Sequence, residues 1–203
     1  MGYRTASLLI LFFLFPFLKT NAQSKIIGEC AIRFSITQTA TLDTIGSKWV
    51  YVKGDDCKTI LNAPQLVQTL LFNVQHNNAL IAKDIGTSHF LQEISYPPSN
   101  TPNLLSMKEL VGDSVTKILG YTCKGVEQKW SDGVVYQIWY IPEISVTVNA
   151  FELAFKEVPG LVLSYTIVPV AGNAIHYQAT YLDLSPIPLS QFNINKELYQ
   201  RID

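Results

Sequence analysis

Alternation of apolar and polar residues dominates the chain and predicts β-strands. Cys30, Ile32, Phe34 and Ile36 alternate with more polar neighbours, which indicates a strand with one buried and one exposed face. Further strand-like segments cover 48–54, 57–63, 69–75, 79–85, 89–95, 161–168 and 174–184. Closely spaced strands with few helical patterns predict a mainly β fold, a single antiparallel β domain over residues 23–203.

Turn signals separate these strands. Gly54-Asp55-Asp56 and His76-Asn77-Asn78 predict hairpin loops, and Ser131-Asp132-Gly133 is the strongest signal. Asp-Gly favours a type I′ turn, which needs positive φ at both central residues. Residues 134–141, "VVYQIWYI", are largely apolar on both faces and therefore predict a central strand that is covered on both sides.

Only two segments carry helix signals. Residues 149–160, "NAFELAFKEVPG", place Asn149 and Glu152 at the two positions of a capping box and end in Pro-Gly. Residues 103–112, "NLLSMKELVG", carry a weaker pattern of the same kind. The tail from Ser185 is broken by prolines and predicts an extended arm that packs on the domain.

The N-terminus has the pattern of a cleaved secretory signal. Leu8–Leu18 is an apolar run behind Arg4, and Thr20-Asn21-Ala22 offers small residues before a cut ahead of Gln23. The alternative is a membrane anchor, but the run is shorter than the about 20 residues that a span needs. We therefore expect a signal peptide over residues 1–22 and a mature chain, without a transmembrane segment, in the periplasm or secreted.

Charge and composition exclude some partners and some chemistry. The whole chain holds 15 basic and 16 acidic residues, and it has no run of basic residues, so nucleic acid is a poor partner. Ser164 and His176 lie in plain strand patterns, and no Gly-x-Ser-x-Gly elbow is present, so we expect no enzyme. The histidines and cysteines have no metal-ligand spacing, and we expect neither a metal nor another cofactor.

The three cysteines leave two alternatives open. Cys30, Cys57 and Cys123 can form at most one intramolecular bridge, which an exported protein permits. If a bridge forms, we expect Cys57–Cys123, and three free thiols are the alternative. Cys123 lies in a strand pattern, without a helix N-terminus or a cation on its own face, and we interpret it as structural.

The hairpin around Gly133 also carries a resemblance. "TKILGYTCK", "DGVVYQIWY" and "FKEVPGLVLSY" resemble secreted proteins of the Bacteroidota in the GLPGLI family and a neighbouring domain family of unknown function. The last element is Val158-Pro159-Gly160-Leu161 here, without the first Gly-Leu of that family. The resemblance covers most of the mature chain and implies a fold similar to LolA and LolB, a half-barrel made of a curved antiparallel sheet with one or two short helices. It implies no activity.

A half-barrel would have a concave face that can hold a ligand. We expect six aromatic residues to line it: Phe34, Trp49, Tyr51, Trp139, Tyr165 and Tyr177. A mostly apolar cavity would suit a lipid, a lipoprotein anchor or a hydrophobic peptide. Alternatively, these aromatics fill the core, and the protein binds an envelope protein through its sheet edges or face. The sequence thus predicts a non-enzymatic binding protein of the cell envelope or, as the alternative, an interaction module.

Overall fold

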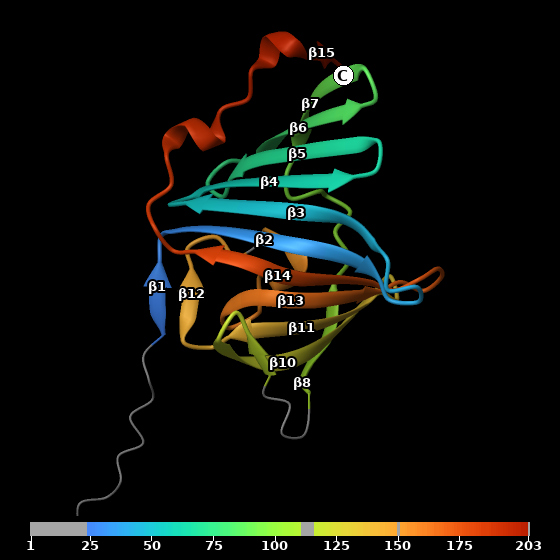
Figure 1. The fold of residues 1–203 in the computed structure, drawn as a ribbon, viewed down its shortest axis with the longest axis vertical. Coiled ribbons are helices and arrows are strands. Elements are labelled where there is room, and N and C mark those ends of the chain that lie inside the picture. The colour runs from blue at the N-terminus through green and yellow to red at the C-terminus, as the bar shows by residue number, and fades with distance from the viewer. Residues whose placement is uncertain (1–23, 111–115, 150, 203) are drawn as a thin grey trace, which may run out of the picture.

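The computed structural model describes residues 24–110, 116–149 and 151–202. This part of the chain is mainly β, with a 13-stranded, mostly antiparallel sheet and a small two-stranded sheet (Figure 1). In chain order the strands are β1 (Lys25–Ile27), β2 (Glu29–Gln38), β3 (Thr44–Lys53), β4 (Asp56–Ala63), β5 (Leu66–Asn73), β6 (Asn78–Ile85), β7 (Ser88–Ser95), β8 (Leu104–Glu109), β9 (Thr116–Ile118), β10 (Tyr121–Trp130), β11 (Val135–Ile141), β12 (Ile144–Val146), β13 (Leu161–Val168), β14 (Ile175–Asp183) and β15 (Gln200–Arg201). The predicted mainly β fold is confirmed.

The large sheet consists of two runs of neighbouring strands that meet in its middle. Strands β2 to β7 are neighbours in both sequence and space, and β8, β10, β11, β13 and β14 form the second run. The two runs join where β2 lies beside β14 (Figure 1). This pairing places Phe34 opposite Ala179 and Ile36 opposite Tyr177. Among the described strands, parallel pairing is confined to two short contacts, β1 with β12 and β7 with β15.

One face of the large sheet carries the hydrophobic core, and we call it the core face. Successive strand residues alternate between faces, whereas cross-strand partners share a face. Ile32, Phe34 and Val50 are fully buried on the core face. Arg33 follows Ile32 on β2, and Trp49 precedes Val50 on β3. These two residues are cross-strand partners, and they lie on the opposite face, which we call the outer face.

The predicted hairpins are confirmed, but the prediction of a type I′ turn at Asp132-Gly133 is wrong. Among the described residues here, only Gly133 has a positive φ, 83°. Its amide donates to the carbonyl of Trp130, and the amide of Trp130 donates to the carbonyl of Val134, so the loop has three residues. Three-residue loops of this kind end in a left-handed residue. A turn with positive φ at both central positions occurs instead at Leu119-Gly120, between β9 and β10.

The helix predictions fail in one case and hold only in part in the other. Residues 104–109 form strand β8, which pairs with β10 along one edge of the sheet. Residues 149–160 contain one short 3-10 helix, η1 (Leu153–Phe155). Asn149 does not cap its start, because its side-chain amide donates to the carbonyls of Phe155 and Val158 at 2.9 Å each.

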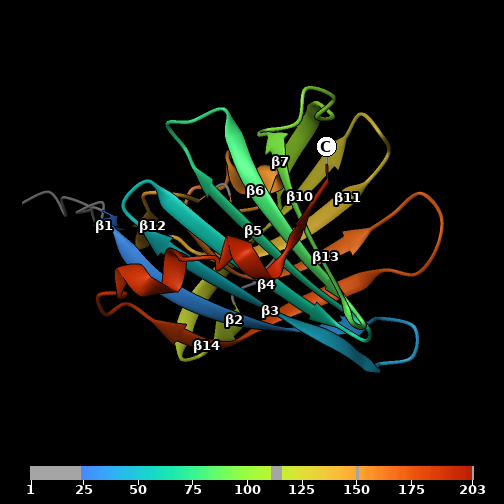
Figure 2. The same cartoon turned by 90° about the horizontal axis from the view of Figure 1, so that it is seen from above.

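The tail forms the predicted extended arm. It contains the 3-10 helices η2 (Leu189–Phe192) and η3 (Lys196–Leu198) and crosses the outer face, red in Figures 1 and 2. Lys58 of β4 donates to the carbonyls of Gln191 and Asn193, at 2.7 and 3.3 Å. Strand β15 then pairs with β7. The arm therefore covers one edge of the large sheet.

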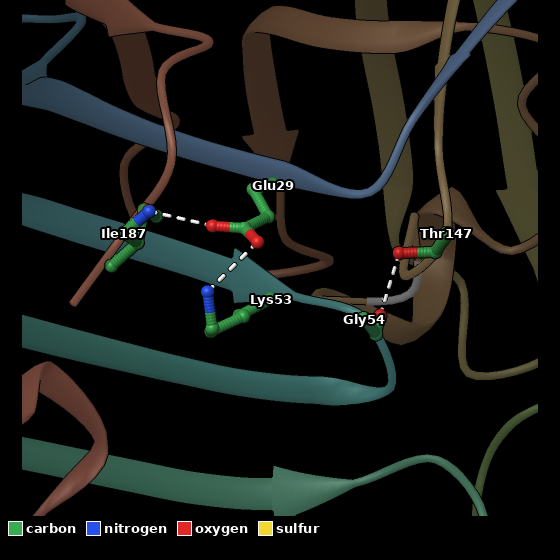
Figure 3. Close-up of polar contacts among 5 residues, drawn as sticks. All are labelled: Glu29, Lys53, Gly54, Thr147 and Ile187. Carbon is green, nitrogen blue, oxygen red and sulfur yellow. Dashed lines mark hydrogen bonds and ion pairs between the residues drawn. The ribbon is translucent and has the colours of Figure 1, made fainter. Parts of the chain in front are cut away.

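Polar contacts fix the start of the arm (Figure 3). Glu29 of β2 accepts a hydrogen bond from the backbone amide of Ile187 at 2.6 Å and an ion-pair contact from Lys53 at 2.8 Å. Nearby, the Thr147 hydroxyl donates to the carbonyl of Gly54 at 2.6 Å. The arm and the segment after β12 are thus held at the same end of strands β2 and β3.

The predicted signal peptide, residues 1–22, lies outside the described residues, and so does Gln23. In the part of the chain that the structure describes, no helix is long and apolar enough to cross a membrane.

Candidate functional site

A cleft of about 350 Å³ opens on the core face of the large sheet. Its walls come from strands β3, β4, β5, β10, β11 and β14, and from the segment around η1. Leu61 and Leu70 provide aliphatic surface, and Trp130, Tyr136 and Tyr177 provide aromatic surface. Hydroxyl and amide groups of other lining residues make the cleft mixed in polarity, not purely apolar.

An ion pair between Lys48 and Glu152 lies in this cleft. Lys48 comes from β3 and Glu152 from the residue before η1, and the lysine ammonium contacts one carboxylate oxygen directly. The Lys48 side chain is only 8% exposed, so its charge depends on a partner for stability. The ammonium also lies 5.9 Å above the ring of Phe151. Glu152 therefore neutralises a nearly buried cation and attaches the η1 segment to the sheet.

Aromatic packing holds the η1 segment against the sheet. Phe155 packs edge-on against Tyr165 at a centroid distance of 4.8 Å, and Phe151 packs against Phe34 at 6.2 Å. Both phenylalanines of the segment are buried. Such contacts fix ring orientation as well as burying area. The position of Glu152 is thus set by apolar contacts on both sides of it in sequence.

Three tyrosines border the cleft: Tyr96, Tyr136 and Tyr177. Burial is the main cause that raises the pKa of Tyr136 and of Tyr177 to about 12, and the negative charge of Glu152 adds to it. The pKa of Tyr96 is raised by the same two causes in the same order. These phenols are therefore neutral at physiological pH and can donate hydrogen bonds to a ligand.

Three of the six predicted aromatic residues lie on the core face, and one lines the cleft. Phe34 and Tyr165 are fully buried, so they belong to the core beneath the cleft. Tyr177 stacks on Tyr165 at 4.3 Å with the ring planes 8° apart, and its other side borders the cleft. Phe34 and Tyr165 therefore match the alternative prediction that these aromatic residues fill the core, whereas Tyr177 lines the cleft.

Trp49, Tyr51 and Trp139 do not line the cleft, which corrects the prediction. Trp49 and Tyr51 alternate with Val50 on β3 and lie on the outer face, stacked on each other at 5.6 Å. There they border the arm near Ile187. Trp139 lies opposite Ser164 of β13, also on the outer face. Trp49 and Tyr51 are half-buried beside the arm, and Trp139 is half-buried with its ring against Gly125, so all three are packing residues of the outer face.

The sequence interpretation missed both members of the ion pair. Lys48 has the same strand phase as Val50 and Val52, which are fully buried. A lysine in phase with a buried apolar row was the signal that could have found it. Glu152 was interpreted only as a helix-capping residue, and its partner could not be read from local sequence.

The cysteines are free thiols, and the predicted Cys57–Cys123 bridge is not formed. All three are fully buried. Burial raises the pKa of Cys30 to about 12 and that of Cys123 to about 11, and it also raises the pKa of Cys57. Within residues 24–110, 116–149 and 151–202, no group of three or more His, Cys, Asp or Glu side chains is placed to hold a metal ion.

Comparison of the sequence with models of known protein families gave no match. A search among curated proteins likewise found no relative of this chain.

Proposed function

We propose that this protein is a non-enzymatic binding protein of the periplasm or extracellular space that holds one small amphiphilic ligand in the cleft. The observation that carries the proposal is the mixed lining of a cleft of about 350 Å³, with leucine and aromatic side chains beside neutral phenols and one ion pair. Ligand pockets typically combine apolar walls with a few polar groups that orient the ligand.

The same lining supports a half-barrel like that of LolA and LolB. Leu70 of β5 and Trp130 of β10 border one cleft, although six strands separate β5 from β10 in the sheet order. With strands about 4.8 Å apart, a flat sheet would place these two strands more than about 30 Å from each other. A sheet that curves around its core face accounts for both observations, and its concave side would then be the binding face.

The cleft volume limits the ligand to one of modest size. At about 350 Å³ it lies near the lower end of the range for small-molecule pockets, about 300–1,000 Å³. An alkyl chain of medium length or a short apolar peptide segment fits this range better than a complete lipid with several chains. We therefore propose that the cleft holds a single alkyl chain or the side chains of a short peptide segment. The polar end of this ligand lies near Lys48 and Glu152.

Binding of an uncharged apolar dye, N-phenylnaphthylamine, tests the proposal. Its fluorescence should rise saturably on addition of the purified protein. Leu70→Trp, which fills the cleft, should abolish the saturable rise, whereas Thr180→Trp, at an exposed position of β14, should retain it. No saturable binding by the wild type, or undiminished binding by Leu70→Trp, would reject the proposal.

The open edge of β8 favours a second candidate function, binding of an envelope protein. Strand β8 ends the order of the large sheet, and among the described residues nothing pairs with its second edge. Leu105 in this strand is 69% exposed. An exposed edge with an apolar side chain can accept an extended segment of a partner. Co-purification of an envelope protein that Ser106→Pro abolishes would support this function.

A further inference from the structure

The ion pair of the cleft is exposed asymmetrically. The Lys48 side chain is 8% exposed and that of Glu152 is 33% exposed. The positive end is therefore enclosed by protein, and the negative end faces the cleft. Asp132, at the tip of the β10–β11 hairpin, also borders the cleft and adds a second carboxylate. A ligand that enters the cleft thus meets two carboxylates and one cation that is already neutralised.

The field of Glu152 reaches the surrounding tyrosines. Its charge contributes, after burial, to the raised pKa of Tyr96, Tyr136, Tyr165 and Tyr177. Tyr96 follows β7, and the other three tyrosines lie on β11, β13 and β14, so the charge of Glu152 acts on groups from several elements around the cleft. Low local dielectric strengthens such interactions relative to those in water.

Aromatic rings add to the attraction for positive charge. Phe151, Tyr136, Tyr177 and Trp130 border the cleft. Trp130 and Tyr136 pack edge to face at 6.3 Å. Ring faces attract ammonium and guanidinium groups as well as apolar chains. Carboxylates and ring faces therefore favour the same kind of polar group.

We infer that the polar end of the ligand is a cation, a primary amine or a guanidinium, bound at Glu152 and Asp132, and that ligands ending in a carboxylate or phosphate are excluded. This inference rests on the proposed function, because it names the ligand class of the same cleft. The apolar part of the ligand lies along Leu61, Leu70 and Tyr177.

Three compounds with the same alkyl chain test the inference: decylamine, decanol and decanoate. Each is titrated calorimetrically into the wild-type protein at neutral pH, below its micellar concentration. Decylamine should bind at least about tenfold more tightly than decanoate, a difference of about 1.4 kcal/mol, with decanol between them. Equal or reversed affinities, with decanol still bound, would overturn the inference alone. If none of the three binds, the proposed function and the inference both fall.

Charge variants locate the preference. Glu152→Gln leaves Lys48 without its counter-charge, so the preference should reverse towards decanoate, whereas Glu157→Gln, an exposed neighbour outside the cleft, should retain the wild-type order. If Glu152→Gln does not fold, Asp132→Asn provides the test, because its side-chain oxygen can still accept the hydrogen bond from the Val134 amide. That variant should lose several-fold of the amine preference, and an unchanged preference would contradict the assignment.

Discussion

The indole of Trp139 lies against Gly125 on the neighbouring strand. The two residues are cross-strand partners of β11 and β10, and a Cβ atom added to Gly125 would lie 3.0 Å from Cζ3 of the indole. Leu110 closes the other side, with its Cδ1 atom 2.8 Å from the same position. The glycine is explained by the ring that covers it, because a glycine inside a strand often marks a place where another group approaches closely.

Trp139→Ala should destabilise the protein by about 2–3 kcal/mol, less than the about 3–5 kcal/mol typical of fully buried aromatic residues, because Trp139 is only partly buried. Gly125→Ala alone should cost about 1–2 kcal/mol through overpacking. In the Trp139→Ala background the alanine should be neutral or stabilising. Urea titration of the four proteins gives the coupling energy. Additive effects would mean that the indole does not pack on Gly125.

Gly160→Ala should destabilise the protein by about 3 kcal/mol. A Cβ atom here would lie 2.2 Å from the backbone oxygen of Ile141 and 2.5 Å from Cδ2 of Tyr140. Backbone atoms of a paired strand cannot move aside cheaply, so the cost lies at the upper end for overpacking. Gly28→Ala is the matched control, because nothing lies within 4 Å of its added Cβ atom. Equal stability of the two variants in urea would contradict this close approach.

Leu119→Asn should stabilise the protein by about 0.5–1 kcal/mol. Leu119 has a φ of 51°, and it precedes Gly120, with a φ of 84°, in the turn between β9 and β10. The left-handed conformation costs an ordinary L-residue about 1–2 kcal/mol, and asparagine tolerates it better. Leu119 is exposed, so little packing is lost. The urea midpoint should rise at unchanged m-value, and Leu119→Val, as the control, should lower it.

Glu29 should make stability depend on pH through the contacts in Figure 3. The pKa of Glu29 lies below its ordinary value of 4.5. The main cause is the hydrogen bond from Lys53, and the hydrogen bond from the amide of Ile187 is the second. A depressed carboxyl pKa gives stability that is present above the unfolded-state pKa and is lost as pH falls through the folded-state pKa. The difference in thermal midpoint between wild type and Glu29→Gln should therefore narrow on acidification below pH 4.5. A constant difference would mean that the carboxylate does not hold the arm.

The thiols should not react with Ellman's reagent in the native protein. Cys30, Cys57 and Cys123 are buried, and their raised pKa values keep them protonated at neutral pH. After unfolding in urea without reductant, all three should react, because all are free. A count of one reactive thiol in the unfolded protein would show that two of the three cysteines form a disulfide, and it would contradict the free thiols.

Local patterns predicted most strands, because period-two alternation and turn residues are properties of neighbouring positions. The segment 103–112 is the exception. Its apolar spacing and flanking Asn103 and Gly112 match a helix, but pairing with β10 places Leu104–Glu109 in the sheet. Long-range pairing can override local preference, and a partner strand is not visible in a short window of sequence.

The candidate site was harder to predict than the fold. Alternation placed Trp49 and Val50 on opposite faces, but it could not show which face holds the cleft, because both faces of β3 carry apolar residues. The register shift between Trp139 and Tyr140 likewise cannot be read from sequence. The pairing of Lys48 with Glu152 joins residues 104 positions apart, so only the folded chain brings them together.

The join between β2 and β14 determines how late in synthesis the large sheet can be completed. A hydrogen bond from the Thr39 hydroxyl to the carbonyl of Ala174 at this join spans 135 residues. Strands β2 to β7 can form hairpins as soon as they are synthesised, whereas β2 has no neighbour on its other side until β14 is complete. Until then the backbone edge beside Ile32 and Phe34 is unpaired, which makes the half-made chain prone to aggregation. On a nascent chain one edge of β2, the first long strand, therefore stays open until β14, the last long strand, pairs with it.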